Sequence, residues 1–369
     1  MITAVLPTYN NEKTIMKVID DVLKYVDNVI VVNDGSTDST HKLLSPRQDI
    51  ILIEYPDGKN RGKGYALKMG LREASRMGYD YAISMDTDGQ HFASDIPAFI
   101  DAIGKEPDSL IIGARNLHAD GMPGKNTFAN RFSNFWFKVE TLHTLSDSQS
   151  GFRLYPLKRL EGMKFFTPRY EFEVEIIVRA AWRDIKVWNI PINVIYPEDR
   201  VSHFRPLRDF TRISILNTFL VAFAFIYYYP KVAWKWLKKE LTRTDESNCR
   251  KAVAIGFGTM MSMMPVWGFQ MVIALFFAHL FRLNKALVLA FSNISLPPVI
   301  PFILWGSLWT GGLILNQPTL ISIDSLTIDS ALQSFWQYVL GAIVFAPLCG
   351  GVVGLSSYLI SRLIGRHDE

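Results

Sequence analysis

The amino-acid sequence predicts an α/β domain, a mostly parallel sheet with helices on both faces, followed by an α-helical membrane domain. Residues 1–209 alternate short apolar runs with amphipathic segments, whereas residues 252–281, 286–316 and 332–361 contain no Asp, Glu, Lys or Arg. Such alternation is typical of a parallel sheet, and each uncharged stretch exceeds the roughly 20 residues that span a bilayer. We therefore expect an α/β domain over residues 1–209, an interfacial helix and basic linker over 210–251, and a membrane domain over 252–369.

The first part of the chain has a βαβαβαβ rhythm. The apolar runs expected as strands are residues 3–6, 29–32, 50–54 and 81–85, and the amphipathic segments between them are residues 12–25, 37–44 and 64–76. Residues 96–103 and 109–113 continue the pattern, helical or irregular segments follow to about residue 183, and residues 185–195 are expected as two strand pieces around Pro191. Ligands are expected where loops leave the carboxyl ends of the strands.

Neither the N-terminal residues nor the cysteines indicate a secreted protein. The first residues lack a basic region and Pro7 interrupts their apolar run, so we expect a strand there and not a signal peptide. Cys249 and Cys349 are too few and too far apart to indicate a disulfide framework. Nothing in the sequence therefore calls for an oxidising compartment.

The strongest single motif is Met85-Asp86-Thr87-Asp88-Gly89-Gln90-His91, at the end of an apolar strand. In an extended chain Asp86 and Asp88 project to the same side, with Gln90 beside them. Such oxygen ligands suit a magnesium or manganese ion that keeps positions open for phosphate oxygens. Aspartates in a glycine-containing loop are also ordinary turn residues, so the spacing alone leaves both interpretations open.

Two further strand ends carry polar groups. In Asn33-Asp34-Gly35-Ser36-Thr37, a hydroxyl is expected to cap the next helix, which leaves Asp34 as an acceptor for a nucleobase or a ribose. After the first strand, Tyr9 offers an aromatic face and Glu12 a carboxylate. Three strand ends in a row are therefore expected to present acidic and polar groups at one edge of the sheet.

The segment Asn60-Arg61-Gly62-Lys63-Gly64 brings flexible backbone and cations that could approach a diphosphate. It is not a P-loop, because the spacing before Lys63 is one residue short and Gly64 stands where Ser or Thr is needed. No dinucleotide-binding glycine fingerprint follows the first strand either. Phosphate binding is therefore expected to depend on a metal and on side-chain cations.

Five motifs in this order resemble family 2 glycosyltransferases, and within that family the dolichyl- or polyprenyl-phosphate mannose and glucose synthases. The motifs are Pro7-Thr8-Tyr9-Asn10, Asn33-Asp34-Gly35-Ser36-Thr37-Asp38, Asn60-Arg61-Gly62-Lys63-Gly64, Asp86-Thr87-Asp88-Gly89-Gln90 and Asp147-Ser148-Gln149-Ser150-Gly151-Phe152-Arg153. The resemblance covers residues 1–209. It implies a GT-A fold, an inverting mechanism and a UDP- or GDP-sugar donor whose diphosphate is bridged by a divalent ion.

The same resemblance implies roles for individual residues. Pro7, Tyr9, Glu12 and Asp34 would hold the nucleoside, Lys63 would lie near the phosphates, and Asp86, Asp88 and Gln90 would bind Mg²⁺ or Mn²⁺. Residues 196–205 resemble the loop that closes over the donor phosphates in these synthases, with Arg200, Ser202, His203 and Arg205 as the phosphate-facing candidates.

The sequence does not decide whether the sugar is transferred to a phosphate or to a hydroxyl group. A lipid phosphate is already an anion and needs cations rather than a base, and the candidates are Arg115, Arg131 and Arg153, the last within the signature that includes Ser150. A hydroxyl acceptor requires a carboxylate base, for which Asp147 and the run Glu171, Glu173, Glu175 are available. That run fits a solvated acidic helix face equally well.

Basic residues cluster just before the uncharged stretches. They are Lys231, Lys235, Lys238, Lys239, Arg243, Arg250 and Lys251, with Trp234 and Trp236 among them. This pattern favours an anionic membrane surface over nucleic acid. The apolar residues 213–229, ending at Pro230, are expected as a helix at the interface.

Charge and proline placement predict a membrane topology. Basic residues flank residues 252–281, and Pro265-Val266-Trp267-Gly268 interrupts them, which favours a re-entrant hairpin with both ends cytoplasmic. Residues 286–316, broken at Pro297-Pro298 and Pro301, would cross outward, and residues 332–361 would return. We therefore expect a multi-pass protein of the inner (cytoplasmic) membrane with its catalytic domain and both termini in the cytoplasm.

The C-terminal part resembles an uncharacterised membrane module sometimes fused after such transferases. Broken helices can also mark a transport path, but within these stretches only His279 is titratable in the physiological range, so anchoring or delivery of a lipid acceptor is favoured. The expected function is transfer of a hexose from a nucleotide diphosphate sugar to a polyprenyl phosphate or another membrane lipid. The alternatives are hydroxyl-directed transfer in glycolipid or surface polysaccharide synthesis, and a non-catalytic membrane scaffold or transporter.

Overall fold

The computed structural model describes residues 1–115, 124–195, 205–266, 268–316 and 335–365. Within it the chain forms two compact units, Met1–Pro230 and Lys231–Glu369. The finer division at residues 209 and 251 stays a prediction.

Seven strands of the first unit form one sheet in the order β3-β2-β1-β4-β6-β5-β7. The strands are β1 (Ile2–Thr8), β2 (Val29–Asn33), β3 (Ile51–Glu54), β4 (Tyr81–Ser84), β5 (Leu110–Arg115), β6 (Arg153–Pro156) and β7 (Val187–Ile192). The pairs β1–β2, β2–β3, β1–β4 and β5–β7 are parallel, and β6 runs antiparallel to both β4 and β5. The mostly parallel sheet predicted from the sequence is confirmed.

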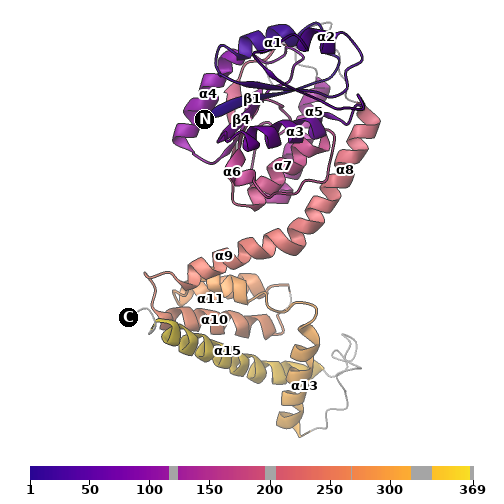
Figure 1. The fold of residues 1–369 in the computed structure, drawn as a ribbon. Helices are drawn as coiled ribbons and strands as arrows, with labels where there is room; N and C mark the ends of the chain where they lie inside the picture. The colour runs from indigo at the N-terminus through magenta and orange to yellow at the C-terminus, as the bar shows by residue number, and fades with distance from the viewer. Residues whose placement is uncertain (116–123, 196–204, 267, 317–334, 366–369) are drawn as a thin grey trace. The chain divides into compact units, whose positions relative to one another are not determined.

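Helices cover both faces of this sheet (Figure 1), which explains why its central strands are apolar on both sides. In β1, Val5 points to one face whereas Ala4 and Leu6 point to the other. The first face packs against α3 (Lys63–Arg76), α5 (Gly124–Thr141), α6 (Leu157–Leu160) and α7 (Glu171–Trp182). The second packs against α1 (Ile15–Val22), α2 (Thr40–Leu44), the 3₁₀ turn η1 (Ala93–Asp95) and α4 (Ile96–Lys105).

The end of the sheet differs from the prediction of two strand pieces around Pro191. The structure has a single strand, β7, with Pro191 inside it and paired to β5. Because β7 is the edge strand, the missing N–H of Pro191 removes no hydrogen bond from a central ladder.

The helix after the sheet is longer than the sequence predicted. α8 (Pro206–Phe223), the π-helical turn η2 (Ala224–Tyr228) and α9 (Tyr229–Leu241) follow without a break, so the helix does not end at Pro230. Proline lacks an N–H and crowds the preceding turn of an α-helix, and the wider π turn just before Pro230 relieves both problems. By length and composition, residues Arg208–Leu241 could cross a membrane.

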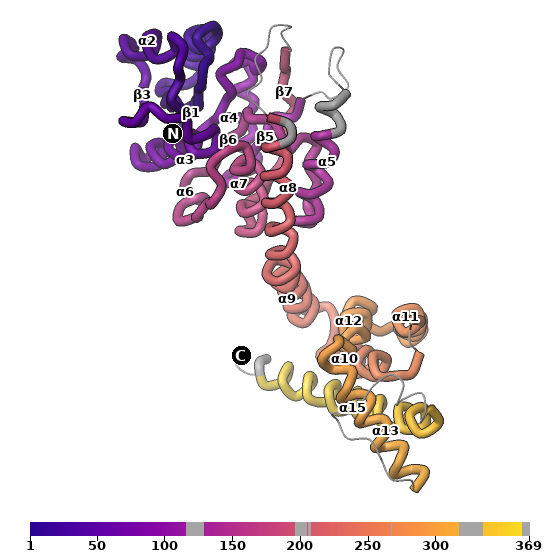
Figure 2. Tube along the Cα trace, turned by 90° about the vertical axis from the view of Figure 1, so that its right-hand side faces the viewer, coloured from indigo at the N-terminus to yellow at the C-terminus, as the bar shows by residue number. Residues whose placement is uncertain are grey.

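The second unit is helical. Its helices are α10 (Asn248–Met263), α11 (Gln270–Leu280), α12 (Lys285–Phe291), α13 (Ile300–Leu315) and α15 (Phe335–Gly365). Figure 2 shows α10 beside α12 and α15, and α13 also packs along α15. Phe335–Leu363 is the other described segment long and apolar enough to span a membrane.

The breaks expected at prolines are mostly present. The chain leaves helical geometry between α10 and α11, around Pro265, and between α12 and α13, around Pro297-Pro298. Pro301 was expected as a further break, but it occupies the first turn of α13, where no intrahelical N–H bond is lost. The re-entrant insertion and the direction of each crossing remain predictions.

One member of the basic cluster is not at the surface. Lys251 is buried, and its ammonium group donates hydrogen bonds to the carbonyls of Leu241 (2.7 Å) and Arg243. It therefore satisfies the last carbonyl of α9 and one just beyond the helix, a position that suits a cation. Lys235, Lys238, Lys239, Arg243 and Arg250 are exposed.

Two helix glycines give a matched test of the packing between α3 and the sheet. A Cβ at Gly70 would lie 2.3 Å from Val5 Cγ1, whereas a Cβ at Gly104 in α4 would meet nothing within 4 Å. We expect Gly70→Ala to lower the free energy of unfolding by about 1–3 kcal/mol through overpacking. Gly104→Ala should leave it unchanged or raise it by up to about 1 kcal/mol. Denaturant unfolding of the full chain checks this, and equal effects of the two substitutions would contradict the packing described.

Candidate active site

Polar loops meet at the carboxyl ends of β1, β2 and β4. These strands are neighbours, with β1 in the middle. After β1 the chain builds β2 and β3 on one side of it and then returns to place β4 on the other side. In parallel α/β sheets such a switch point leaves a crevice in which ligands bind. The three strand ends singled out in the sequence therefore do lie side by side.

The loops after β1 and β2 hold each other through reciprocal hydrogen bonds. The Asn10 side chain accepts from the Thr37 N–H (2.7 Å), and Asn10 has a positive φ of 53° that asparagine tolerates. The Glu12 carboxylate accepts from the Ser39 N–H (2.9 Å), and the Glu12 N–H donates to the Asp38 carboxylate (3.1 Å). Glu12, expected to contact a nucleoside, here fixes the neighbouring loop.

Pro7 is buried and Tyr9 half-buried at the same edge of the sheet. Their placement at the end of β1 agrees with the position predicted for them, and their contact with a nucleoside remains a prediction.

Asp34 ties the loop that precedes α3 to the end of β2. Its buried carboxylate accepts hydrogen bonds from the N–H groups of Arg61 and Gly62 (both 2.8 Å) and from the Asn60 amide (2.9 Å). Burial raises the pKa of Asp34 even though the two N–H groups act to lower it. The loops approach closely because residue 35 is a glycine, whose Cβ would lie 2.5 Å from the Gly58 carbonyl oxygen. Asp34 thus holds the backbone of Arg61 and Gly62, the two residues that precede Lys63.

Lys63, the first residue of α3, lies between two carboxylates. Its Nζ is 2.7 Å from Asp86 Oδ1 and 3.1 Å from Glu173 Oε2. Burial acts to lower the pKa of Lys63, but the two carboxylates outweigh it and raise that pKa above its usual value. Burial likewise acts to raise the pKa of Asp86, and the Lys63 charge is the main influence that holds it below its usual value. Lys63 and Asp86 are therefore both ionised at neutral pH.

The acidic run on α7 divides into different environments. Because the run is helical, Glu171 and Glu175 share a face that Glu173 does not. Glu175 is buried and accepts from the N–H groups of Phe166 and Thr167, and it pairs with Arg179. Glu173 contacts Lys63, and its Oε1 is buried without a hydrogen-bond partner.

Asp88 and Gln90 lie together, as the sequence predicted. Asp88 accepts hydrogen bonds from the Gln90 N–H (3.1 Å) and the Gln90 side-chain amide (2.6 Å). Thr87, between the two aspartates, is buried and bonds to the Pro7 carbonyl (3.2 Å) and the Asn11 amide (2.8 Å). Sequence reasoning missed Thr87 and Asn11, although a small polar residue between two aspartates was a usable signal.

The residues at this edge fit a divalent cation. The Asp86 side chain is 28% exposed, and the donor set of Asp86, Asp88 and Gln90 provides the oxygen ligands that Mg²⁺ and Mn²⁺ prefer. A Cβ at residue 151 would lie 2.5 Å from Asp86 Oδ2, so Gly151 leaves room for this carboxylate. Among the described residues no group of three or more His, Cys, Asp or Glu side chains gathers to hold an ion, so water and phosphate oxygens would have to complete the coordination.

Asp147 is not placed as a general base. It is fully buried, and its carboxylate accepts from the Arg115 guanidinium (2.7 and 3.1 Å), the Asn130 amide (2.5 Å) and the Gln149 N–H (3.0 Å). Burial acts to raise the pKa of Asp147, but Arg115 and these hydrogen bonds outweigh it and lower the pKa. The ion pair also engages Arg115, one of the three arginines expected as candidates for the acceptor phosphate.

Arg153 has a structural position instead of the phosphate-binding one expected. Its side chain is fully buried and donates to the carbonyls of Ser148 (2.9 Å), Ser150 (2.6 Å) and Glu173 (2.6 Å). Ser150 is buried too, and its hydroxyl accepts from the Phe152 N–H. The Ser-Gly-Phe-Arg signature therefore shapes the loop that sets Gly151 against Asp86.

The remaining candidates are dispersed. Arg131 is exposed on α5, and Arg205 is exposed before α8, where its N–H donates to Asp209 (2.8 Å). Arg200, Ser202 and His203 lie outside the described residues.

Arg153 and Arg159 form a matched pair that tests the structural position of Arg153. Arg159 is exposed, whereas Arg153→Met would leave the carbonyls of Ser148 and Ser150, two buried residues, without this donor. Since each such group costs about 1–3 kcal/mol, we expect Arg153→Met to lower the free energy of unfolding by several kcal/mol and Arg159→Met to change it little. Chemical denaturation measures both, and a fully stable Arg153→Met protein would show that the guanidinium is not needed for folding.

The two parts of the chain match two different protein families. Residues 3–160 match the family described as glycosyl transferase family 2, and residues 231–369 match a family described as an uncharacterized protein conserved in bacteria. An uncharacterised protein of Methanocaldococcus jannaschii is 30% identical over 208 residues, which are 54% of this chain and 84% of that protein. The UDP-N-acetylglucosamine–dolichyl-phosphate N-acetylglucosaminyltransferase of Methanococcus voltae is 28% identical over 220 residues, 54% of this chain and 87% of the relative.

Among solved structures, glucosyl-3-phosphoglycerate synthase of Mycobacterium tuberculosis is similar with a TM-score of 0.44 and 22% identity, over 60% of this chain and 78% of that one. The family match lies in the N-terminal part and includes the five motifs. The chain belongs to glycosyltransferase family 2, and it is a glycosyltransferase joined to a C-terminal helical module of a second, uncharacterised family.

Proposed function

We propose that the protein transfers a hexose, with inversion and with a divalent metal ion, from a UDP- or GDP-sugar to a polyprenyl phosphate or another membrane lipid. The observation that carries this proposal is the group of Asp86, Lys63 and Glu173 next to Asp88, at the carboxyl edge of the sheet. It combines carboxylates for a cation with an ammonium group for phosphate oxygens.

The donor side follows from charge. When a nucleoside diphosphate leaves the anomeric carbon, negative charge develops on a phosphate oxygen and must be stabilised. A Mg²⁺ or Mn²⁺ ion bound by Asp86, Asp88 and Gln90 would supply most of that stabilisation. Lys63, held at the same carboxylate, adds a positive charge that stays ionised because its pKa is raised.

The acceptor side favours a phosphate. Of the carboxylates considered as bases, Asp147 and Glu175 are both enclosed by hydrogen-bond donors. Glu171 and Glu173 each have a buried oxygen without a hydrogen-bond partner, and Glu173 is ion-paired with Lys63. A phosphate acceptor requires no proton removal, so this set of carboxylates suits it better than a hydroxyl.

The relatives support a membrane lipid as the acceptor. The Methanococcus voltae relative is named for dolichyl phosphate, as is a dolichyl-phosphate beta-glucosyltransferase of Trichomonas vaginalis that is 26% identical. Two described segments have the length and composition of membrane spans, and exposed basic residues lie on α9. We infer a multi-pass protein of the inner membrane whose catalytic domain faces the cytoplasm, the side on which basic residues gather.

Replacing Asp88 tests the metal-dependent reaction. We expect Asp88→Ala to lower transfer by at least about 100-fold, because charge on the leaving phosphate is no longer stabilised. Asp101→Ala, at an exposed position of α4, should keep wild-type activity. Membranes are incubated with labelled nucleotide sugars and polyprenyl phosphate, and lipid-extractable label is counted. If the labelled product of the wild type stays water-soluble, the proposed lipid acceptor is wrong. If Asp88→Ala transfers sugar at the wild-type rate, Asp88 is not a ligand of a required metal ion.

Replacing Glu173 separates the phosphate acceptor from the hydroxyl alternative. With a phosphate acceptor no general base acts, so Glu173→Gln should retain activity within about tenfold of wild type. A general base contributes about 10²–10⁴-fold, and a loss of that size, with folding unchanged, would instead assign Glu173 as the base for a hydroxyl. Steady-state rates with each purified protein distinguish these outcomes.

A further inference from the structure

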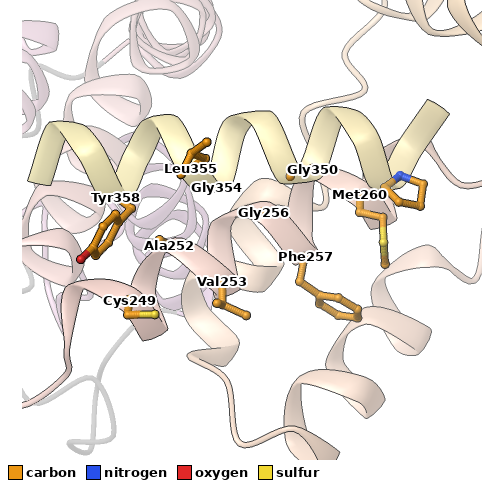
Figure 3. A pocket seen from close by; sticks show the side chains of 12 residues that line it. Cys249, Ala252, Val253, Gly256, Phe257, Met260, Gly350, Gly354, Leu355 and Tyr358 are labelled. Carbon is orange, nitrogen blue, oxygen red and sulfur yellow. The ribbon is translucent and has the colours of Figure 1, made fainter. Parts of the chain in front are cut away.

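The C-terminal unit contains an open apolar groove that the proposed transfer chemistry does not use. It has a volume of about 460 Å³ and lies between α10 and α15, each of which contributes residues three and four positions apart (Figure 3). Cys249 and Tyr358 lie at one end of the groove and Met260 at the other. The helical rise of about 1.5 Å per residue makes the distance from Cys249 to Met260 about 17 Å.

Glycines form the floor of the groove. A Cβ at Gly256 would lie 2.6 Å from the Gly350 carbonyl oxygen, and a Cβ at Gly350 would lie 2.5 Å from the Gly256 carbonyl oxygen. The two helices therefore touch backbone to backbone, as small residues permit in membrane helices. Gly351, the next residue, also lines the groove, but a Cβ there would meet nothing within 4 Å. The space beside Gly351 is therefore part of the open groove and is not filled by another helix.

The walls are hydrocarbon and aromatic. Phe257, Met260 and Leu355 flank the floor, and Leu355 is 61% exposed. A cavity of this volume falls within the range of small-molecule sites, and its lining offers almost no hydrogen-bonding group. Flexible methionine and flat aromatic side chains adapt well to an irregular hydrocarbon chain.

One end of the groove is basic. Arg362 is exposed on α15 one turn beyond Tyr358, on the same helix face, and Arg250 is exposed next to Cys249. The acidic residues nearest to Arg250 in sequence have other partners, since Asp245 pairs with Arg243 and Glu246 accepts from the Asn284 amide. An apolar groove with cations at one end is complementary in charge to a hydrocarbon chain that carries an anionic head group.

We propose that this groove binds the first part of the hydrocarbon chain of a polyprenyl phosphate, with the phosphate at the end marked by Arg250 and Arg362. A single groove about 17 Å long accommodates one chain, which favours a single-chain isoprenoid over a two-chain phospholipid. The rest of a long chain extends into the bilayer. This inference rests on the proposed lipid acceptor and assigns the uncharacterised module a part in holding it.

The test measures lipid binding by the full chain in detergent, without a sugar donor, by native mass spectrometry. The probes are undecaprenyl phosphate, undecaprenol and dioleoyl phosphatidylglycerol. Wild type should bind undecaprenyl phosphate at least tenfold more tightly than either of the others. Gly351→Phe adds a ring at a groove-lining position where a Cβ meets nothing within 4 Å, and it should weaken binding at least tenfold. Val352→Phe, at a neighbouring residue that is 65% exposed and does not line the groove, should not.

Two further variants complete the test. Arg362→Gln should reduce the preference for undecaprenyl phosphate over undecaprenol. Leu355→Trp narrows the groove from its exposed wall and replaces Gly351→Phe if that variant has a lowered thermal midpoint.

The outcomes separate this inference from the proposed function. Equal binding of undecaprenyl phosphate and phosphatidylglycerol by wild type, or undiminished binding by both groove-filling variants, would overturn the groove assignment. If these variants lose binding as expected but the wild type transfers no sugar to lipid, the groove stands and the proposed function fails. If they transfer sugar with wild-type kcat/KM for undecaprenyl phosphate, the proposed function stands and the groove assignment fails.

Discussion

The placement of Lys63 between Asp86 and Glu173 is the interaction on which the site depends. It joins three separate parts of the first unit: the start of α3, the end of β4 and the first turn of α7. Two carboxylates this close to one point repel each other, and a cation between them offsets that repulsion. The ammonium group holds the pKa of Asp86 below its usual value, so this carboxylate stays ionised beside Asp88, the second proposed metal ligand.

The surrounding hydrogen bonds hold this group in position. Asp34 fixes the backbone of residues 61 and 62 just before Lys63, and Thr87 anchors the aspartate loop to the end of β1. Arg153 donates hydrogen bonds to the carbonyls of Ser148 and Ser150, just before Gly151, and also to the carbonyl of Glu173. Several motif residues thus act by positioning, which is what a preorganised site requires.

The sequence was sufficient for features that are local or periodic. Apolar runs followed by polar residues predicted the strand ends, and so placed Asp34, Asp86 and Asp88 at one edge of the sheet. Pro265 and Pro297 correctly predicted breaks between helices. Partners distant in sequence could not be read in this way. The contact of Lys63 with Glu173, and the capture of Arg115 by Asp147, depend on tertiary packing, and a buried arginine such as Arg153 looks like a surface arginine in a sequence. Pro230 was taken as a helix end because the π turn that accommodates it has no sequence signal.

The most direct test of the central interaction is a double-mutant cycle between Lys63 and Asp86, measured as free energies of unfolding of the full chain. Lys63→Met leaves two partly buried carboxylates without their cation, and Asp86→Asn leaves the ammonium group with one partner fewer. Neutralising both removes the imbalance, so the double variant should be less destabilised than the sum of the single variants, with a coupling of about 1–3 kcal/mol. Strictly additive effects would contradict the account, since they would mean that Lys63 and Asp86 do not stabilise each other.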